Sequence, residues 1–182
     1  MVDKQIIIAL LRGINVGGRN KLPMKSLVSM FNDAGCSNVR TYIQSGNVVF
    51  EAEPALARQI PSVITASIFE HFGFNIPVVA RTAGELGKIV HSNPFLRTGA
   101  DERALYVAFL ADLPDPTRLA TLDPDRSPPD EFAVLGREIY LQCPNGLART
   151  KLTNAYFDSK LKTTSTLRNW RTTLKLFELS TD

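Results

Sequence analysis

The sequence predicts an α+β fold made of two ferredoxin-like (α-β plait) units and a C-terminal amphipathic helix. The first observation is QIIIALL at 5–11, a continuous apolar run of strand length. The second is a similar run, RALYVAFL at 103–110, after which the strand, helix and hairpin signals recur in the same order. No residue-level repeat accompanies them, so the duplication is one of pattern only.

Turn residues and hydrophobic spacing define the elements of the predicted first subdomain, residues 1–81. Proline suits the first position of a helix and glycine its C-terminal cap, as at Pro23 and Gly35. Ser45-Gly46-Asn47 reads as a hairpin turn, and Pro61 should kink the second helix or delay its start. The expected order is strand 5–11, helix 23–34, strands 39–44 and 48–50, helix 54–72 and strand 76–81.

A joining helix and loop at 82–102 lead into the second predicted subdomain, 103–182. Thr82 and Glu85 have the spacing of a capping box, which starts the joining helix. The expected order is then strand 103–110, a short helix near 117–122, hairpin strands 131–135 and 138–143, helix 147–160, strand 162–166 and a final helix.

The final helix is predicted from its periodicity. One face holds the apolar residues Leu167, Trp170, Leu174 and Phe177. A neighbouring stripe holds the cations Arg168, Arg171 and Lys175. This spacing places Trp170 in the core, not on a ligand platform.

Both central strands are apolar at consecutive positions, as IIIALL and LYVAFL show. A sheet with one wet face would alternate apolar and polar residues. We therefore expect both faces of each sheet to be covered.

Composition indicates a soluble globular chain of 182 residues, with 44% hydrophobic residues, 21% charged residues and a net charge of +3. No apolar run approaches the roughly 20 residues of a membrane span, and the N-terminus does not resemble a secretory signal. We expect a cytoplasmic protein with no membrane partner. Neither Cys36 nor Cys143 belongs to a CxxC pair, so we expect no metal site.

The stretch GINVGGRN at 13–20 approaches the phosphate-loop pattern GxxxxGK[ST]. Arg19 replaces the lysine, and Asn20 replaces the hydroxyl residue that would hold magnesium. The following helix also starts too late, at Pro23, so an NTPase is disfavoured. The dinucleotide pattern GxGxxG is absent as well, and we expect no cofactor.

A weaker anion-site hypothesis survives these exclusions. In the predicted topology the first strand ends at the sheet edge where the second strand turns into the third, so the loop 12–21 and the turn 44–47 should be neighbours. Backbone amides, amide side chains and cations there would suit a phosphate or a carboxylate. The candidate ligand-binding residues are Arg12, Asn15, Gly17, Gly18, Arg19, Asn20, Lys21, Gln44, Ser45 and Asn47, with Arg168 and Asn169 from the second half. Two purely structural roles are equally open: the glycines only permit a turn, and the polar side chains only join the two loops.

Four stretches together resemble the bacterial family known as domain of unknown function 1697. They are LLRGINVGGRNKLPM, RTYIQSGNVVFE, HSNPF and TLRNWRTTLKLFEL. The resemblance implies two α-β plait subdomains and no known activity. The family's usual GGKNK and RNWNT become GGRNK and RNWRT here, and Arg19 and Arg171 keep or add charge.

Three function classes remain open from the sequence: small-anion binding, nucleic-acid or polyanion binding, and a protein–protein adaptor role. Basic residues cluster at 12–40 and 149–175, which favours an anionic partner of either size. A sheet-face reader of nucleic acid would need open aromatic residues, so binding would have to use basic loops and the C-terminal helix. Only His71 and His91 are histidines, and the sequence assigns no catalytic residue and no oligomeric state.

Overall fold

The computed structural model describes residues 3–182 and divides into two compact units. The first unit runs to Gly87 and includes Leu176–Asp182; the second is Lys88–Lys175. The division differs from the predicted one, because the C-terminal segment belongs with the first half. Together the units form a mixed α+β fold with two four-stranded antiparallel sheets.

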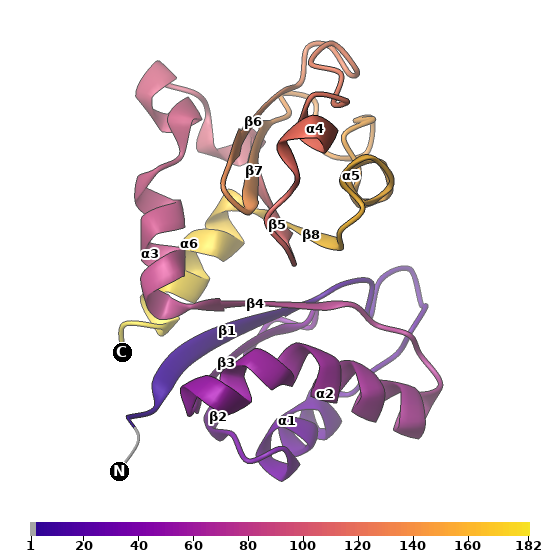
Figure 1. Ribbon diagram of the computed structural model, residues 1–182, viewed down its shortest axis with the longest axis vertical. Helices are drawn as coiled ribbons and strands as arrows, with labels where there is room; N and C mark the ends of the chain where they lie inside the picture. Colours follow the sequence, from indigo (N-terminus) through magenta and orange to yellow (C-terminus); the bar gives the residue numbers. More distant parts are fainter. Residues whose placement is uncertain (1–2) are drawn as a thin grey trace. The chain divides into compact units, whose positions relative to one another are not determined.

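The first unit holds a sheet of strand order β2-β3-β1-β4. Its helices α1 and α2 cover one face of that sheet (Figure 1). The elements are β1 (Gln5–Leu11), α1 (Met24–Asp33), β2 (Ser37–Tyr42), β3 (Asn47–Ala52), α2 (Pro54–Phe72) and β4 (Val78–Thr82). They follow the predicted order.

The core of the first unit lies between that sheet face and the two helices. Ile7, Ala9 and Leu11 of β1 join it with Phe31 of α1 and Ile60 of α2. The alternate β1 residues, such as Ile8 and Leu10 at 1% exposure, are buried on the opposite face. Burial therefore does not alternate along Ile7–Leu11, which agrees with the continuous apolar run in the sequence.

The second unit holds a sheet of strand order β6-β7-β5-β8, with α4 and α5 beside it (Figure 1). A core cluster joins Ala108 and Leu110 of β5 to Phe157 of α5. The elements are the 3-10 turns Pro94–Thr98 and Glu102–Ala104, β5 (Leu105–Leu110), α4 (Pro116–Leu119), β6 (Glu131–Leu135), β7 (Glu138–Gln142), α5 (Asn154–Leu161) and β8 (Ser165–Asn169).

Helices α3 (Ala83–His91) and α6 (Trp170–Leu179) carry the chain across the division between the units. The predicted capping box starts α3: the Thr82 amide donates to Glu85 Oε2 at 2.8 Å, and the Glu85 amide donates to Thr82 Oγ1 at 3.1 Å. Within the first unit, Arg40 donates to the Leu179 carbonyl oxygen at 2.7 Å, which ties the end of α6 to β2.

Several predicted boundaries need correction. The hairpin turn occupies 43–46, so Asn47 is the first residue of β3 and not part of the turn. Helix α2 begins at Pro54 and continues through Pro61, so its start is not delayed. Helix α5 begins at Asn154, because the Thr153 side chain caps it by accepting from the Tyr156 amide.

The final helix also begins later than its periodicity predicts. Leu167 and Arg168 belong to β8, and α6 begins at Trp170, because Asn169 Oδ1 accepts the Thr172 amide at 2.8 Å. Arg168 is therefore not part of a helical stripe with Arg171, which weakens the polyanion alternative. Trp170 is 1% exposed, so its predicted place in the core is confirmed.

Gly46 should be the glycine of the first unit that is hardest to replace. It has φ +82°, and an added Cβ would lie 2.6 Å from Leu11 Cβ and 3.0 Å from Ile14 Cδ1. Gly46→Ala should lower the free energy of unfolding by roughly 2–4 kcal/mol, through backbone strain and overpacking. Urea unfolding followed by circular dichroism measures this loss.

Gly73→Ala is the matched control, since Gly73 has φ +71° and nothing within 4 Å of an added Cβ. It should lose only the strain component, about 1–2 kcal/mol. Equal losses in the two variants would contradict the close approach at Gly46.

The two buried thiols predict a loss of stability at alkaline pH. Burial raises the pKa of Cys36 and of Cys143 from the ordinary 9.0 to about 11. Unfolded thiols therefore lose their protons first, so this contribution is complete below pH 9 and falls as the pH rises toward 11. Urea unfolding between pH 8 and 11 should show a shallower decline for a Cys36→Ala/Cys143→Ala variant than for the wild type. Parallel declines would refute the assignment.

Candidate functional site

The end of β1 and the turn between β2 and β3 lie side by side, as the sequence predicts. The Leu11 amide donates to the Gly46 carbonyl oxygen at 2.8 Å, and the Arg12 amide donates to the Pro77 carbonyl oxygen at 3.0 Å. The glycine-rich loop after β1 therefore starts between the hairpin turn and the segment that enters β4.

The loop itself folds into a short hairpin. Asn15 donates to the Asn20 carbonyl oxygen at 3.2 Å, and Arg19 donates to the Val16 carbonyl oxygen at 3.0 Å, both through backbone amides. Gly17 and Gly18 have φ +57° and +74°, which are the angles of a type I′ turn. The glycines thus make a tight turn. A phosphate-binding loop, by contrast, leads directly into the N-terminus of a helix.

Asn15 fastens this hairpin to both of its neighbours. Its Nδ2 donates to the carbonyl oxygens of Leu22 and Gln44, each at 2.9 Å, and its Oδ1 accepts the Leu22 amide at 2.8 Å. Asn20 Nδ2 donates to the Gly13 carbonyl oxygen at 2.9 Å. These amide side chains hold the loop in place. This is the structural role that the sequence left open for them, in which polar side chains join the loop to its neighbours.

Asn47 and Ser45 form a similar network inside the turn. Asn47 Nδ2 donates to the Tyr42 carbonyl oxygen at 3.1 Å and to Ser45 Oγ at 3.0 Å. Asn47 is fully buried, so this amide is part of the framework beneath the site.

Several backbone amides of the loop, unlike its side-chain amides, form no hydrogen bond in the part of the chain that the structure describes. Among residues 3–182, the backbone amides of Gly17, Gly18 and Lys21 have no acceptor, and no backbone amide of the segment 13–21 donates to the 44–47 turn. The turn conformation therefore leaves N–H donors without an acceptor in the described chain. This arrangement meets the requirement of the anion-site hypothesis that the neighbouring turn should not consume the loop's donors.

An open cleft of about 640 Å³ lies beside the loop. Its polar and charged side chains come from Asn15, Lys21, Lys25 and Gln44, and Gly18 adds its backbone. Its apolar lining comes from Leu22, Pro23, Met24 and Phe72. No Asp or Glu is among these residues, so Lys21 and Lys25 are the charged residues of the lining.

The start of α1 adds to that positive character. Pro23 is the N-cap residue, no side chain caps the helix, and its first turn contains no acid. The first amides of a helix have no intrahelical acceptor and carry the positive end of its dipole. Lys25 also lies in this turn, which is an unfavourable place for a cation unless an anion is near.

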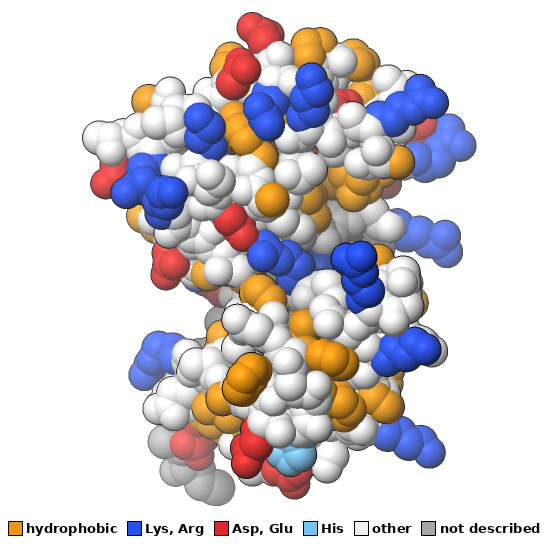
Figure 2. Space-filling model, turned by 90° about the vertical axis from the view of Figure 1, so that its right-hand side faces the viewer, with side chains coloured by type: hydrophobic (Ala, Val, Ile, Leu, Met, Phe, Trp, Pro, Cys, Tyr) orange, Lys and Arg blue, Asp and Glu red, His pale blue; other side chains and the backbone are white. Residues whose placement is uncertain are grey.

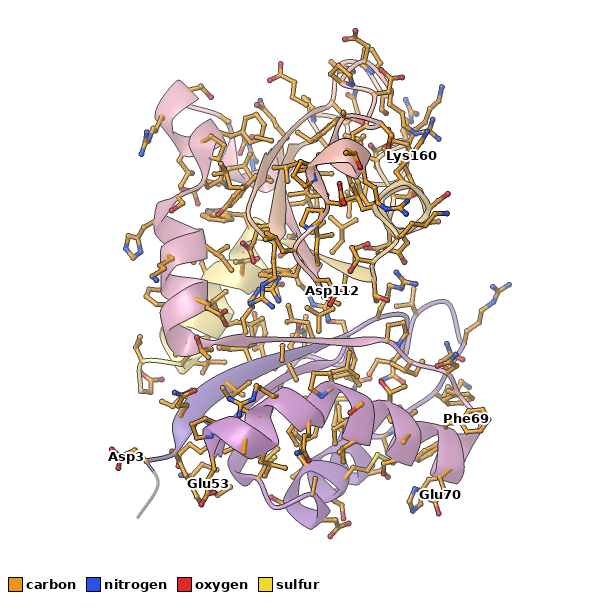
Figure 3. The ribbon with its side chains drawn as sticks, in the orientation of Figure 1. Asp3, Glu53, Phe69, Glu70, Asp112 and Lys160 are labelled. Carbon is orange, nitrogen blue, oxygen red and sulfur yellow. The ribbon has the colours of Figure 1, made fainter. Side chains whose placement is uncertain are left out.

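Sequence reasoning missed Lys25, Phe72 and the three residues from Leu22 to Met24. Phe72 ends α2, immediately before the C-cap Gly73, and the topology brings helix α2 to an end at the same sheet edge as the loop. That signal was present in the sequence. Figure 3 shows its neighbours Phe69 and Glu70 at this outer end of α2.

The remaining predicted residues have varied positions. Arg19 is exposed at the loop tip, and its side chain has no partner in the described part of the chain. Arg12 is half-buried, and Gln44 contributes its carbonyl oxygen to Asn15.

Arg168 and Asn169 belong to β8 of the second unit. Arg168 Nη1 donates to Thr166 Oγ1 and to the Leu167 carbonyl oxygen, each at 2.9 Å, and burial lowers its pKa to about 10. Asn169 caps α6. Their participation in anion binding stays a prediction.

The described residues give little support for histidine chemistry or metal binding. His71 is exposed, and its Nδ1 lies 2.8 Å from the Ser67 carbonyl oxygen. Within residues 3–182 no group of three or more His, Cys, Asp or Glu side chains could hold a metal ion. None of the described helices combines the length and the apolar character needed to span a bilayer.

These features define an α+β protein with two four-stranded antiparallel sheets and a cationic cleft beside the loop that follows the first strand. The chain belongs to the family described as proteins of unknown function DUF1697, whose model matches residues 5–140.

A solved structure of the conserved bacterial protein SP0830 from Streptococcus pneumoniae is similar, with a TM-score of 0.70 and 19% identity. The alignment covers 98% of this chain and 99% of that one. At this identity the likeness concerns the fold alone. The comparison with curated proteins gave no match.

Asn15→Asp tests the framework of the site, because it keeps the size of the side chain and removes both donated hydrogen bonds. A carboxylate would face two carbonyl oxygens, and we expect a loss of about 1–3 kcal/mol in unfolding free energy. Asn75→Asp is the control, since Asn75 is exposed and its side chain has no partner among the described residues. Equal stability of the two variants would show that Asn15 does not fasten the loop.

Proposed function

We propose that the cleft beside the glycine-rich loop binds a small anion that bears a phosphate or a carboxylate. The observation that carries the proposal is the pair of lysines, Lys21 and Lys25, on a cleft whose lining contains no acid. Neither lysine forms an ion pair within residues 3–182. Two cations without a counter-ion repel each other, and an anion between them would remove that repulsion.

Two features of the backbone support the same function. The Gly18 and Lys21 amides have no acceptor in the described chain, and both residues line the cleft. The uncapped start of α1 lies at the same place, since Pro23, Met24 and Lys25 are also lining residues. Unpaired amides near two lysines are suited to the oxygens of an anion.

The proposal is one of binding and not of a reaction. The cleft lining contains no Asp, Glu, His or Cys, which are the usual acid–base and nucleophilic groups. Of the two side-chain amides in the lining, that of Asn15 is occupied by Leu22 and Gln44. The lysines and the unpaired backbone amides are therefore the groups that would recognise a ligand.

We also propose that both units are ferredoxin-like and arose by duplication. Each has two strands at the centre and the order second-third-first-fourth across its sheet, as β2-β3-β1-β4 and β6-β7-β5-β8. All of their strand pairs are antiparallel. This is the strand order of the α-β plait.

We propose a cytoplasmic site of action on the basis of the cysteines. Cys36 and Cys143 are both free and buried. Unpaired thiols are typical of proteins that work in a reducing compartment.

Thermal unfolding of the full chain with inorganic phosphate, acetate and methyl phosphate tests the proposed function. At a concentration of one hundred times Kd, a ligand should add about 2.7 kcal/mol, or roughly 5–10 °C in Tm. A Lys21→Gln/Lys25→Gln variant should lose most of this gain, whereas Arg19→Ala should lose less, because Arg19 is not a lining residue.

Lys160→Gln provides the control, since Lys160 is an exposed lysine on α5 of the second unit (Figure 3). It should keep the full gain. An equal gain in the double variant and the wild type, or no gain with any of the three anions, would refute the proposed function.

A further inference from the structure

We infer that the ligand of this cleft carries a planar aromatic group next to its anionic group, and that Phe72 is the residue that receives this group. The inference rests on the proposed function, since it assigns the anionic group to Lys21 and Lys25. It goes further by naming the class of ligand as an aryl phosphate or an aromatic carboxylate.

The size of the cleft is the first argument. Its volume of about 640 Å³ lies within the range of roughly 300–1,000 Å³ that pockets for organic ligands occupy. An inorganic phosphate would occupy only a small part of this space. Two lysines can satisfy the charge of one anionic group, so the rest of the cleft is available to another part of the ligand.

The chemistry of the lining is the second argument. Leu22, Pro23, Met24 and Phe72 form an apolar wall beside the two lysines. Met24 and Phe72 are half-buried and pack against the edge of the first unit's core. Their exposed apolar area would be removed from water by an apolar group on the ligand, at about 25 cal/mol per Å².

The rings at the end of α2 are the third argument. Phe72 stacks with Phe74, with ring centroids 6.0 Å apart and an interplanar angle of 25°. This contact holds Phe72 in place at the cleft, and a second flat ring can pack against it with favourable geometry. A thioether such as that of Met24 also makes favourable contacts with aromatic rings.

Exposed apolar side chains adjoin two of the lining residues along the chain. Val16, next to Asn15, is 62% exposed, and Ile43, next to Gln44, is 51% exposed. Hydrophobic side chains gather on this side of the molecule over the part that holds the end of α2 (Figure 2). Cations, apolar residues and a fixed ring thus occur together, and a small aromatic anion complements all three.

Calorimetric titration of the full chain with phenyl phosphate, benzoate, methyl phosphate and inorganic phosphate tests this inference. We expect phenyl phosphate or benzoate to bind at least ten times more tightly than the two anions that lack a ring. Phe72→Leu and Phe72→Ala should each reduce that preference, and the alanine variant should bind phenyl phosphate about as weakly as methyl phosphate. Of the two aromatic ligands, the tighter one identifies the anionic group.

Phe69→Ala is the matched control, because Phe69 is an exposed ring on the same helix and does not line the cleft. It should leave all four affinities unchanged. Phe72→Leu keeps an apolar side chain, so it separates a loss of stacking from a loss of folding. Circular dichroism confirms the fold of each variant.

The outcomes distinguish this inference from the proposed function. If all four ligands bind equally well and Phe72 has no effect, the aromatic inference is overturned and anion binding stands. If none of them binds, both are overturned. If the aromatic ligands bind through Phe72 but Lys21→Gln/Lys25→Gln leaves their affinity unchanged, the placement of the anionic group is wrong and both are again overturned.

Discussion

The close approach of β1 to the β2–β3 turn is the constraint on which the rest of the site depends. Gly46 permits it, because its missing Cβ would lie within 3.0 Å of both Leu11 and Ile14. The resulting hydrogen bond from the Leu11 amide fixes where the glycine-rich loop begins. Asn15 can then reach Leu22 on one side and Gln44 on the other. A larger residue at position 46 would separate the two segments and remove one wall of the cleft.

The electrostatics of the cleft follow from that geometry. Folding brings Lys21 and Lys25 to one cleft at the positive end of α1, with no acid in the first turn and no side-chain cap. Such an arrangement is unfavourable for folding, since like charges repel and a cation is disfavoured near a helix N-terminus. Both lysines are exposed and line a cleft with an apolar wall, so the proposed anion would reduce this repulsion.

The parts of the fold that the sequence predicts well are those marked by glycine, proline and capping residues. Pro54 and the Thr82–Glu85 pair begin helices where local chemistry says they should, whereas Pro23, predicted as the first residue of α1, is its N-cap. The start of the final helix is predicted wrongly, because helical spacing of apolar residues continues by chance into β8. Asn169, a good N-cap residue, is the local signal that the helix starts at Trp170.

The candidate site is predictable from the sequence only in part. Sheet order alone determines which strand ends are neighbours, so the topology places the loop beside the turn. It also brings the end of α2 to this edge, but it does not predict that the side chains of Lys25 and Phe72 line the cleft. Their contribution depends on how side chains pack at the edge of the core, and spacing along the chain carries no information about that packing.

The glycine-rich loop can serve both as a tight turn and as part of an anion site, as its hydrogen bonds make clear. A type I′ turn pairs only the residues that flank its tip, here Asn15 with Asn20 and Val16 with Arg19. Gly17 and Gly18 adopt positive φ in order to close the turn, and for the same reason their amides receive no acceptor from the rest of the described chain. The glycines therefore serve the backbone and also leave donors at the surface. A loop selected only for a tight turn would need no lysines on the cleft beside it, so their presence favours a loop that also contributes to binding.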